Sequence, residues 1–363
     1  MVLQYKPDLD ETIQRFDAFW AGDVLDRPLV CIRAPKRNAE GNNNVGRMYE
    51  EQYKARTEAD FEAVLRCFEE KSVARTAFLG ESIPFFPLSF SPDMFSSFFG
   101  APIVTSGGKE IDTTWVEPIV QDWSEFSGIM DESPEGNYAR YLRFMEYAAK
   151  YSEGKFLLSA PDMHSNMDAL SALRGAMDLC YDLYDEPDEV ERALKQVQKY
   201  YNPIIQAAAK AGKFDERGHI GWHWLYSKES FATVQCDFAA ICGPNMGERY
   251  IYPYIQEEAS KHTHCSYHFD GVPALPHMEN ILQIPEIDVV QWLPGAGQPN
   301  SSNWIDLLKR IQKAGKGLYI NDWSPAEIKA HFKELSPTKV CYVTFAKSEE
   351  EAEDLLEYMR KNM

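Results

Sequence analysis

The chain has 363 residues, of which 44% are hydrophobic and 13% aromatic, enough to form a full globular core. Its formal net charge is −19 without a cluster of lysine and arginine, which argues against nucleic acid as a partner, because phosphate binding needs concentrated positive charge. No run of about 18 apolar residues is present, so neither a membrane span nor a membrane partner is expected. The polar N-terminus and the scattered cysteines, without a CxxC pair, predict a cytoplasmic protein with reduced thiols.

The first predicted element is a helix over residues 8–20, within an N-terminal helical extension of about residues 1–25. A short apolar strand follows at Leu29–Ile32 and leads into Arg33 and Arg37. Cations directly after a strand can clamp an anionic ligand, whereas the alternative interpretation is a solvated basic loop. The sequence leaves these two interpretations equally open.

The middle of the chain is mainly helical, with one aromatic insertion and one brief strand. A charged amphipathic helix is expected over residues 50–69. Residues 78–118 are irregular and rich in phenylalanine and proline, and they hold Glu81, a lone charge among apolar residues that needs an explanation. The strand is expected at residues 155–159. One long helix is predicted over residues 187–212, with a regular apolar stripe.

Two later segments end in side chains that can titrate or bind ligands. The stretch GHIGWHW predicts a strand that ends in Trp222, His223 and Trp224, and Asp237 follows it in the segment VQCDFAAICGP. The stretch HCSYHFD, residues 264–270, is a strand in which His268 and Asp270 lie on one face, because side chains alternate along an extended chain.

The last third of the chain alternates regularly between short strands and helices. A strand at about 287–292 ends in Gln291 and Trp292, and a strand at 318–320 is followed by Asp322. Such alternation predicts parallel βαβ units, here a (β/α)8 TIM barrel with the N-terminal extension and inserted loops as a single domain over residues 1–363. Active sites of this fold lie at the C-terminal strand ends, so the residues expected to share one rim are His223, His268, Gln291 and Asp322.

Several stretches of the chain resemble the uroporphyrinogen decarboxylase superfamily, which includes corrinoid-linked methyltransferases. They are RPLVCIRAPKR, ALRGAMDLCYDLYDEPDEVERAL, VQCDFAAICGPNMGERYIYPYI, and HFDG with the downstream IDVVQWLPGAG. The resemblance covers about residues 25–360 and implies a (β/α)8 barrel with its site at the C-terminal face.

The methyltransferase branch of this superfamily implies a zinc site formed by H-x-C-G and a later cysteine. In this chain His268 matches the histidine, Asp270 replaces the first cysteine, and Cys341 lies close to the position of the later one. Zinc accepts nitrogen, sulfur and oxygen ligands, and the carboxylate makes the set harder, so the resemblance implies zinc or another divalent metal.

The decarboxylase branch implies an arginine pair spaced four apart after the first strand, a spacing that Arg33 and Arg37 have. It also implies an aspartate in the next site loop, where Glu81 stands here. The tyrosine and the late histidine of that branch have no counterpart in SAPDMHSNMD and VCYVTFAKS.

The sequence therefore predicts an enzyme, most readily a metal-assisted methyltransferase that moves a methyl group between a corrinoid carrier on a partner protein and a thiol acceptor. The alternatives are a decarboxylase of an acidic, tetrapyrrole-like substrate and a non-catalytic barrel that binds a small ligand. The expected catalytic residues are His268, Asp237 and His223. The expected contacts with a small-molecule substrate are Arg33, Arg37, Glu81, Trp222, Trp224, Gln291, Trp292 and Asp322.

Overall fold

The protein is built around a seven-stranded sheet. The computed structural model describes residues 2–37, 39, 45–105 and 113–363. The strands of the sheet lie in the order β2, β1, β13, β12, β11, β10, β9. Their bounds are β1 Leu29–Pro35, β2 Thr76–Gly80, β9 Phe231–Gln235, β10 His264–Asp270, β11 Val289–Leu293, β12 Gly317–Ile320 and β13 Val340–Phe345. Every neighbouring pair is parallel except β1 and β2, so the predicted parallel α/β organisation of the C-terminal half is confirmed.

Six short strands form three further pairs. They are β3 (Phe85–Phe86) with β6 (Leu157–Leu158), β4 (Ile103–Thr105) with β5 (Thr114–Val116), and β7 (His219–Ile220) with β8 (Tyr226–Ser227). Only the first of these pairs is parallel. Among the described residues, the ladders therefore give an open seven-stranded sheet with separate short pairs, not a closed ring of eight strands.

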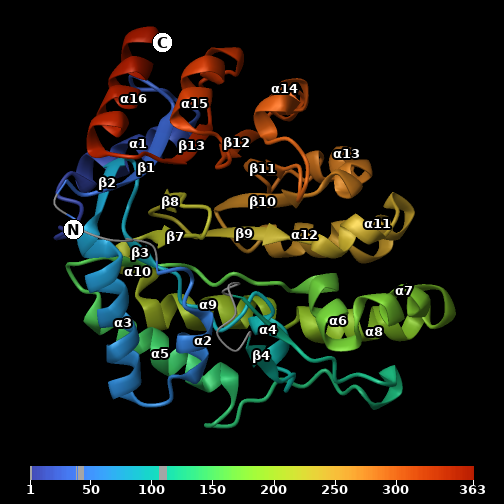
Figure 1. Ribbon diagram of the computed structural model, residues 1–363. Coiled ribbons are helices and arrows are strands. Elements are labelled where there is room, and N and C mark those ends of the chain that lie inside the picture. The colour runs from blue at the N-terminus through green and yellow to red at the C-terminus, as the bar shows by residue number, and fades with distance from the viewer. Residues whose placement is uncertain (1, 38, 40–44, 106–112) are drawn as a thin grey trace.

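Helices lie on both sides of the molecule. In Figure 1, α14, α15 and α16 lie above strands β11 to β13, and α3, α5 and α9 lie below, on the side of the short strands. In the first half of the chain the helices are α1 Leu9–Ala21, α2 Tyr49–Lys54, α3 Glu58–Lys71, α4 Met94–Ser97, α5 Asn137–Tyr151, α6 Asn166–Arg174 and α7 Ala176–Asp185. In the second half they are α8 Pro187–Gln198, α9 Tyr201–Gly212, α10 Phe214–Arg217, α11 Pro244–Tyr250, α12 Tyr252–Ala259, α13 Met278–Leu282, α14 Ile305–Lys313, α15 Pro325–His331 and α16 Glu349–Asn362.

Two predicted helices are each divided in the structure. The helix expected over residues 50–69 is α2 and α3, because Thr57 starts a new helix with a capping box to Asp60. The helix expected over residues 187–212 is α8 and α9. Pro203 explains that break, since its ring clashes with the carbonyl four residues earlier, at Lys199, where α8 has just ended.

The two faces of the sheet hold different apolar clusters. Side chains such as Leu29, Val289 and Cys341 form the inner cluster, which α1 covers at one end through Phe16 and Phe19. Alternate side chains of the same strands belong to the larger outer cluster, packed under the helices. His268 and Gln291 are register partners, and Gln291 alternates with the outer residue Trp292, so this pair lies on the inner face.

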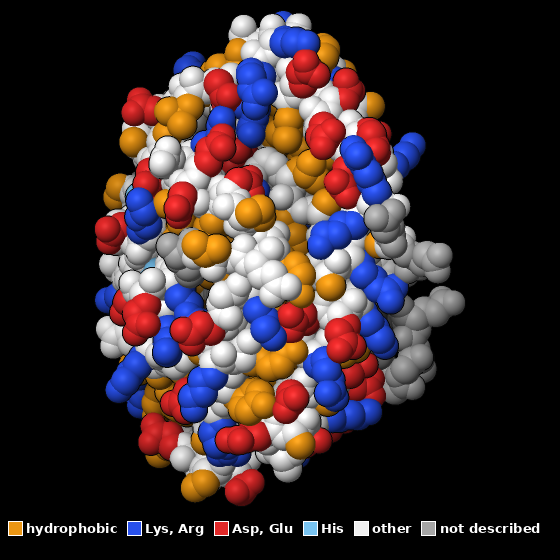
Figure 2. Space-filling view, turned by 90° about the vertical axis from the view of Figure 1, so that its left-hand side faces the viewer, with side chains coloured by type: hydrophobic (Ala, Val, Ile, Leu, Met, Phe, Trp, Pro, Cys, Tyr) orange, Lys and Arg blue, Asp and Glu red, His pale blue; other side chains and the backbone are white. Residues whose placement is uncertain are grey.

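Charges of both signs are mixed on the outside of the molecule. Figure 2 shows lysine and arginine side chains interleaved with aspartate and glutamate over one face. No helix among the described residues is long and apolar enough to cross a bilayer.

Candidate functional site

Three of the four residues expected at one rim meet in a hydrogen-bond network. Gln291 Oε1 bonds His223 Nε2 at 2.7 Å and also bonds His268 Nδ1, while Gln291 Nε2 donates to Asn321 Oδ1 at 2.8 Å. His223 Nδ1 lies 2.9 Å from Ser266 Oγ. Burial lowers the pKa of His223 well below its ordinary value, so this imidazole is neutral at physiological pH.

The network assigns the tautomers of both histidines. An amide oxygen only accepts, so His223 Nε2 and His268 Nδ1 each carry the hydrogen that bonds Gln291. In the neutral imidazole, His268 Nε2 then keeps its lone pair. That atom lies 3.9 Å from Asp237 Oδ1, and the His268 side chain is 11% exposed. His268 is therefore held as a base or ligand whose basic nitrogen faces outward from the network.

A cavity of about 280 Å³ opens beside this network, and Arg33 lies in its wall. The Arg33 guanidinium lies 3.6 Å from the ring centroid of Trp224. Its Nε and Nη2 are buried and have no hydrogen-bond partner among the described residues. Burial lowers the pKa of Arg33 to about 10, so the group stays charged near neutral pH. A buried cation with unused donors in a cavity wall favours an anionic ligand.

Aromatic rings give the cavity its apolar character. Trp222 and Trp224, both expected to touch substrate, line it together with Tyr49 and Phe85. The Trp222 ring also meets the His268 ring edge to face, with 5.1 Å between their centroids. The cavity and the histidine network are therefore two sides of one candidate site.

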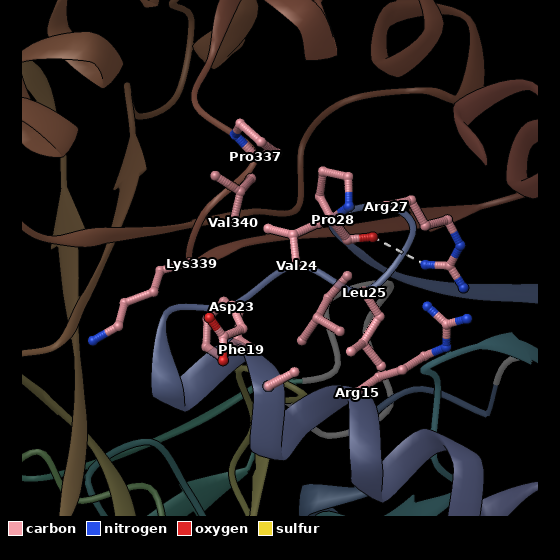
Figure 3. Close-up of a pocket in the computed structure, with 12 residues that line it drawn as sticks. Arg15, Phe19, Asp23, Val24, Leu25, Arg27, Pro28, Pro337, Lys339 and Val340 are labelled. Atoms are coloured by element: carbon pink, nitrogen blue, oxygen red, sulfur yellow. Dashed lines mark hydrogen bonds between the residues drawn. The ribbon is translucent and has the colours of Figure 1, made fainter. Parts of the chain in front are cut away.

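Glu81 was expected to bind substrate, and the structure corrects this prediction. Its carboxylate accepts from Arg27 Nη1 and Nη2 at 2.8 and 2.7 Å and from the Val30 amide at 2.8 Å, and it is 2% exposed. Figure 3 shows Arg27 bonded to the carbonyl of Pro28, with Arg15 of α1 reaching toward the same region. Glu81 is a buried structural ion-pair partner at the start of β1, because its neighbours there are arginines and not solvent.

Arg37 is also not a cavity residue. Its side chain is 59% exposed, and Nε pairs with Glu350 of α16 at 2.8 Å. The acidic first turn of α16 attracts the guanidinium away from the cavity that Arg33 lines. The predicted pair of anion-binding arginines is therefore reduced to Arg33.

Two other expected contacts face elsewhere. Trp292 is 2% exposed and packs in the outer cluster against Phe269 and Trp304, because it alternates with Gln291 along β11. Asp322 accepts from the Ser301 amide at 2.6 Å and anchors that loop. The neighbouring Asn321, and not Asp322, contacts Gln291.

The three predicted metal ligands do not converge. Among the described residues, the ligand atoms of His268, Asp270 and Cys341 form no group within 4.8 Å of one another. Cys341 is fully buried in the inner cluster, with its sulfur 3.9 Å from that of Cys31. Burial raises the pKa of the Cys341 thiol well above its ordinary value, the opposite of what a thiolate ligand needs. The predicted zinc set therefore does not fit this structure.

A different group of side chains satisfies metal-ligand spacing. His164, Asp168 and Asp237, called here the acid–imidazole cluster, have ligand atoms that all lie within 4.8 Å of one another. They line a cavity of about 380 Å³ together with Asp93. Of the three, only Asp237 was predicted from the sequence as a site residue. Asp168, at the start of α6, carried no motif that distinguishes it from a helix-initiating aspartate.

The comparisons with known proteins show the fold of the chain but do not show its family. A methyltransferase from Methanosarcina mazei has a similar structure, with a TM-score of 0.62 and 13% sequence identity over 97% of this chain and 98% of that chain. No family model and no curated protein matches the chain. At this identity the likeness shows a shared fold along the whole chain.

Proposed function

We propose that the protein is a methyltransferase that acts on a small molecule carrying an anionic group. The observation that carries the proposal is the histidine network, which fixes the tautomer of His268 and adjoins an arginine-lined cavity through Trp222. The full-length likeness in fold to a methyltransferase supports the same reaction class. The resemblance to the uroporphyrinogen decarboxylase superfamily is part of this proposal.

The proposed architecture is a closed barrel. Short strands β3 and β6 would complete a ring of eight between β1 and β9, and β7 lies between β6 and β9. A backbone bond supports this, since the Ala160 amide, after β6, donates to the carbonyl of Ile220 in β7 at 2.7 Å. The candidate site then lies at the C-terminal strand ends, where this fold places active sites.

The proposed acceptor is a thiol, and the proposed donor is a methylcorrinoid carried by a partner protein, which supplies an electrophilic methyl group. His268 Nε2 would take the proton of the thiol, and the thiolate sulfur would bond to the methyl carbon. The electron pair of the broken carbon–cobalt bond would stay with the corrinoid. Gln291 holds the imidazole in the tautomer that leaves this nitrogen free. Arg33 binds the anionic end of the acceptor. No step is assigned to His268, Asp270 and Cys341 as a zinc set, because their geometry does not fit one.

The test follows loss of the methyl group from free methylcobalamin in the dark, with a panel of small thiols that carry carboxylate or sulfonate groups. We expect the protein to accelerate the reaction with at least one of them, and His268→Ala to lower kcat about 10²-fold or more. His331→Ala is the matched control, because His331 pairs with Glu334 on the surface and should leave the rate unchanged. A wild-type rate equal to that of buffer, or equal rates for wild type and His268→Ala, would contradict the proposal.

Arg33 also suits the decarboxylation of an acidic substrate, the second candidate. The displacement of Arg37 toward α16 weakens that candidate, because only one of the two arginines implied by the decarboxylase branch lines the cavity. Release of CO2 from an acidic substrate by a protein that fails the methyl-transfer test would favour it. Ligand binding without either reaction would favour the non-catalytic alternative.

A further inference from the structure

Three side chains from three separate elements approach one another at the mouth of the fold. His164 lies in the loop after β6, Asp168 in the first turn of α6, and Asp237 at the start of the turn that follows β9. Their ligand atoms all lie within 4.8 Å of one another. We propose that this acid–imidazole cluster binds one divalent metal ion of the Mn²⁺ or Zn²⁺ class.

Asp168 is already oriented for such a role. Its Oδ2 accepts from the Asp237 amide at 2.9 Å, and its Oδ1 accepts from the Phe238 amide at 2.8 Å. Each carboxylate oxygen keeps a second lone pair after accepting one hydrogen bond. Outer contacts of this kind are what fix the direction of ligating carboxylates in metal sites. The same two bonds tie the turn that carries Asp237 to α6, so two of the ligands are mutually positioned.

The cluster carries an excess of negative charge. Asp93 lines the same cavity, and Asp162 lies two residues before His164. Asp93, Asp168 and Asp237 thus place three carboxylates near one imidazole, and a bound cation would offset their charge.

The spacing and chemistry indicate the class of ion. Ligand atoms held tetrahedrally at about 2.0–2.2 Å from one ion lie about 3.3–3.6 Å apart, so atoms at the 4.8 Å limit would close by a little over about 1 Å. Asp237 can supply that movement, because its side chain is 45% exposed. Two carboxylates with one imidazole favour Mn²⁺ or Zn²⁺ over ions that prefer thiolates. The cavity of about 380 Å³ leaves open positions for water or substrate.

The proposed ion would lie beside the candidate site and not within the predicted zinc set. His268 Nε2 is 3.9 Å from Asp237 Oδ1, so a bound ion would be a direct neighbour of the proposed base. The inference does not depend on methyl transfer, because the cluster and its spacing are independent of which reaction His268 serves.

The experiment measures metal binding itself. Protein stripped with a chelator and dialysed is titrated with Mn²⁺, followed by calorimetry and by loss of the free Mn²⁺ signal in electron paramagnetic resonance. We expect one ion per chain, and a weakening of at least about tenfold in both Asp237→Asn and His164→Gln. Asp237 is exposed enough that its substitution should leave the melting temperature of the metal-free protein unchanged.

The matched controls are Asp270→Asn and Cys341→Ser. Asp270→Asn removes one negative charge close to the cluster without removing a proposed ligand, so it separates ligation from general electrostatic attraction. Wild-type affinity in both controls is the expected result. If Mn²⁺ binding survives in Asp237→Asn and is lost in Asp270→Asn, the inference is wrong. His268 and Asp270 would then be the metal ligands. Failure of the wild type to bind Mn²⁺ or Zn²⁺ would also overturn it.

Discussion

At the scale of single residues, the candidate site depends on one amide. Gln291 accepts from two imidazoles and donates to Asn321, so it fixes which nitrogen of His268 is basic. His223 stacks on Tyr319, with ring centroids 4.5 Å apart, and is closed off from solvent. Of the two histidines, His268 alone is placed to exchange a proton with a ligand, and His223 is a positioning residue.

Replacing Arg33 should weaken ligand binding, whereas replacing Arg37 should not. Arg33→Met removes the buried guanidinium from the cavity wall, and we expect binding of benzoate and 3-phenylpropionate to weaken roughly 10- to 100-fold, the range of one charge-assisted hydrogen-bonding group. Isothermal titration calorimetry measures the affinity. Arg37→Met is the matched control, because Arg37 pairs with α16 outside the cavity. Equal losses in both variants, or none in either, would contradict this assignment.

At the scale of elements, a buried ion pair joins two strands at the start of the chain. Glu81, directly after β2, accepts from Arg27, two residues before β1, and from the Val30 amide within β1. Both side chains are nearly inaccessible, at 3% and 2% exposure. The pair therefore fixes the antiparallel contact of β2 with β1 at the edge of the sheet, next to α1.

Removing one member of this pair should destabilise the fold strongly. Glu81→Ala leaves the Arg27 charge buried and unpaired, which costs about 3–5 kcal/mol of unfolding free energy. Urea unfolding measures the loss. The double variant Arg27→Met, Glu81→Met should recover much of it, because no charge is then left buried. A loss below about 1 kcal/mol in Glu81→Ala would show that solvent reaches the pair, and that Glu81 is open to substrate after all.

Local patterns predicted the strands and their faces, but not the contacts between distant segments. Alternation was sufficient to place His268 on the face that carries Gln291, since that rule depends only on neighbouring residues. The roles of Glu81 and Arg37 depend on partners 54 and more than 300 positions away, which no local pattern specifies. The strand β2 was missed because it borders the irregular, proline-rich segment, and its antiparallel pairing with the distant β1 makes it a strand.

At the scale of the whole molecule, a buried acid links the sheet-side helix α12 to the loop that precedes α6. Ser165 Oγ donates to Glu258 Oε1 at 2.7 Å, and Asn166 Nδ2 lies 3.3 Å from both carboxyl oxygens. Gln198 also contacts this carboxyl group, and its own Oε1 is buried with no donor among the described residues. These side chains donate to the carboxyl group and favour its ionised form, whereas burial disfavours that form more strongly.

Burial raises the pKa of Glu258 to about 8 from an ordinary value of 4.5. The folded protein therefore holds this proton more tightly than the unfolded chain does. The stability that this group contributes is fully present below about pH 4.5 and is lost as the pH rises through about 8. The fold should then weaken with rising pH across that window, through this one carboxyl group.

Glu258→Gln should remove this dependence, because the amide stays neutral at every pH. We expect the unfolding free energy of the variant, minus that of the wild type, to increase by up to about 4 kcal/mol between pH 5 and pH 8. Urea unfolding at several pH values measures the difference in unfolding free energy between the two proteins. Other groups titrate equally in both, so their contributions cancel in this difference. Glu257→Gln, on the exposed side of α12, is the matched control and should follow the wild type. A constant offset between Glu258→Gln and the wild type across the whole range would mean that Glu258 is already ionised in the folded protein.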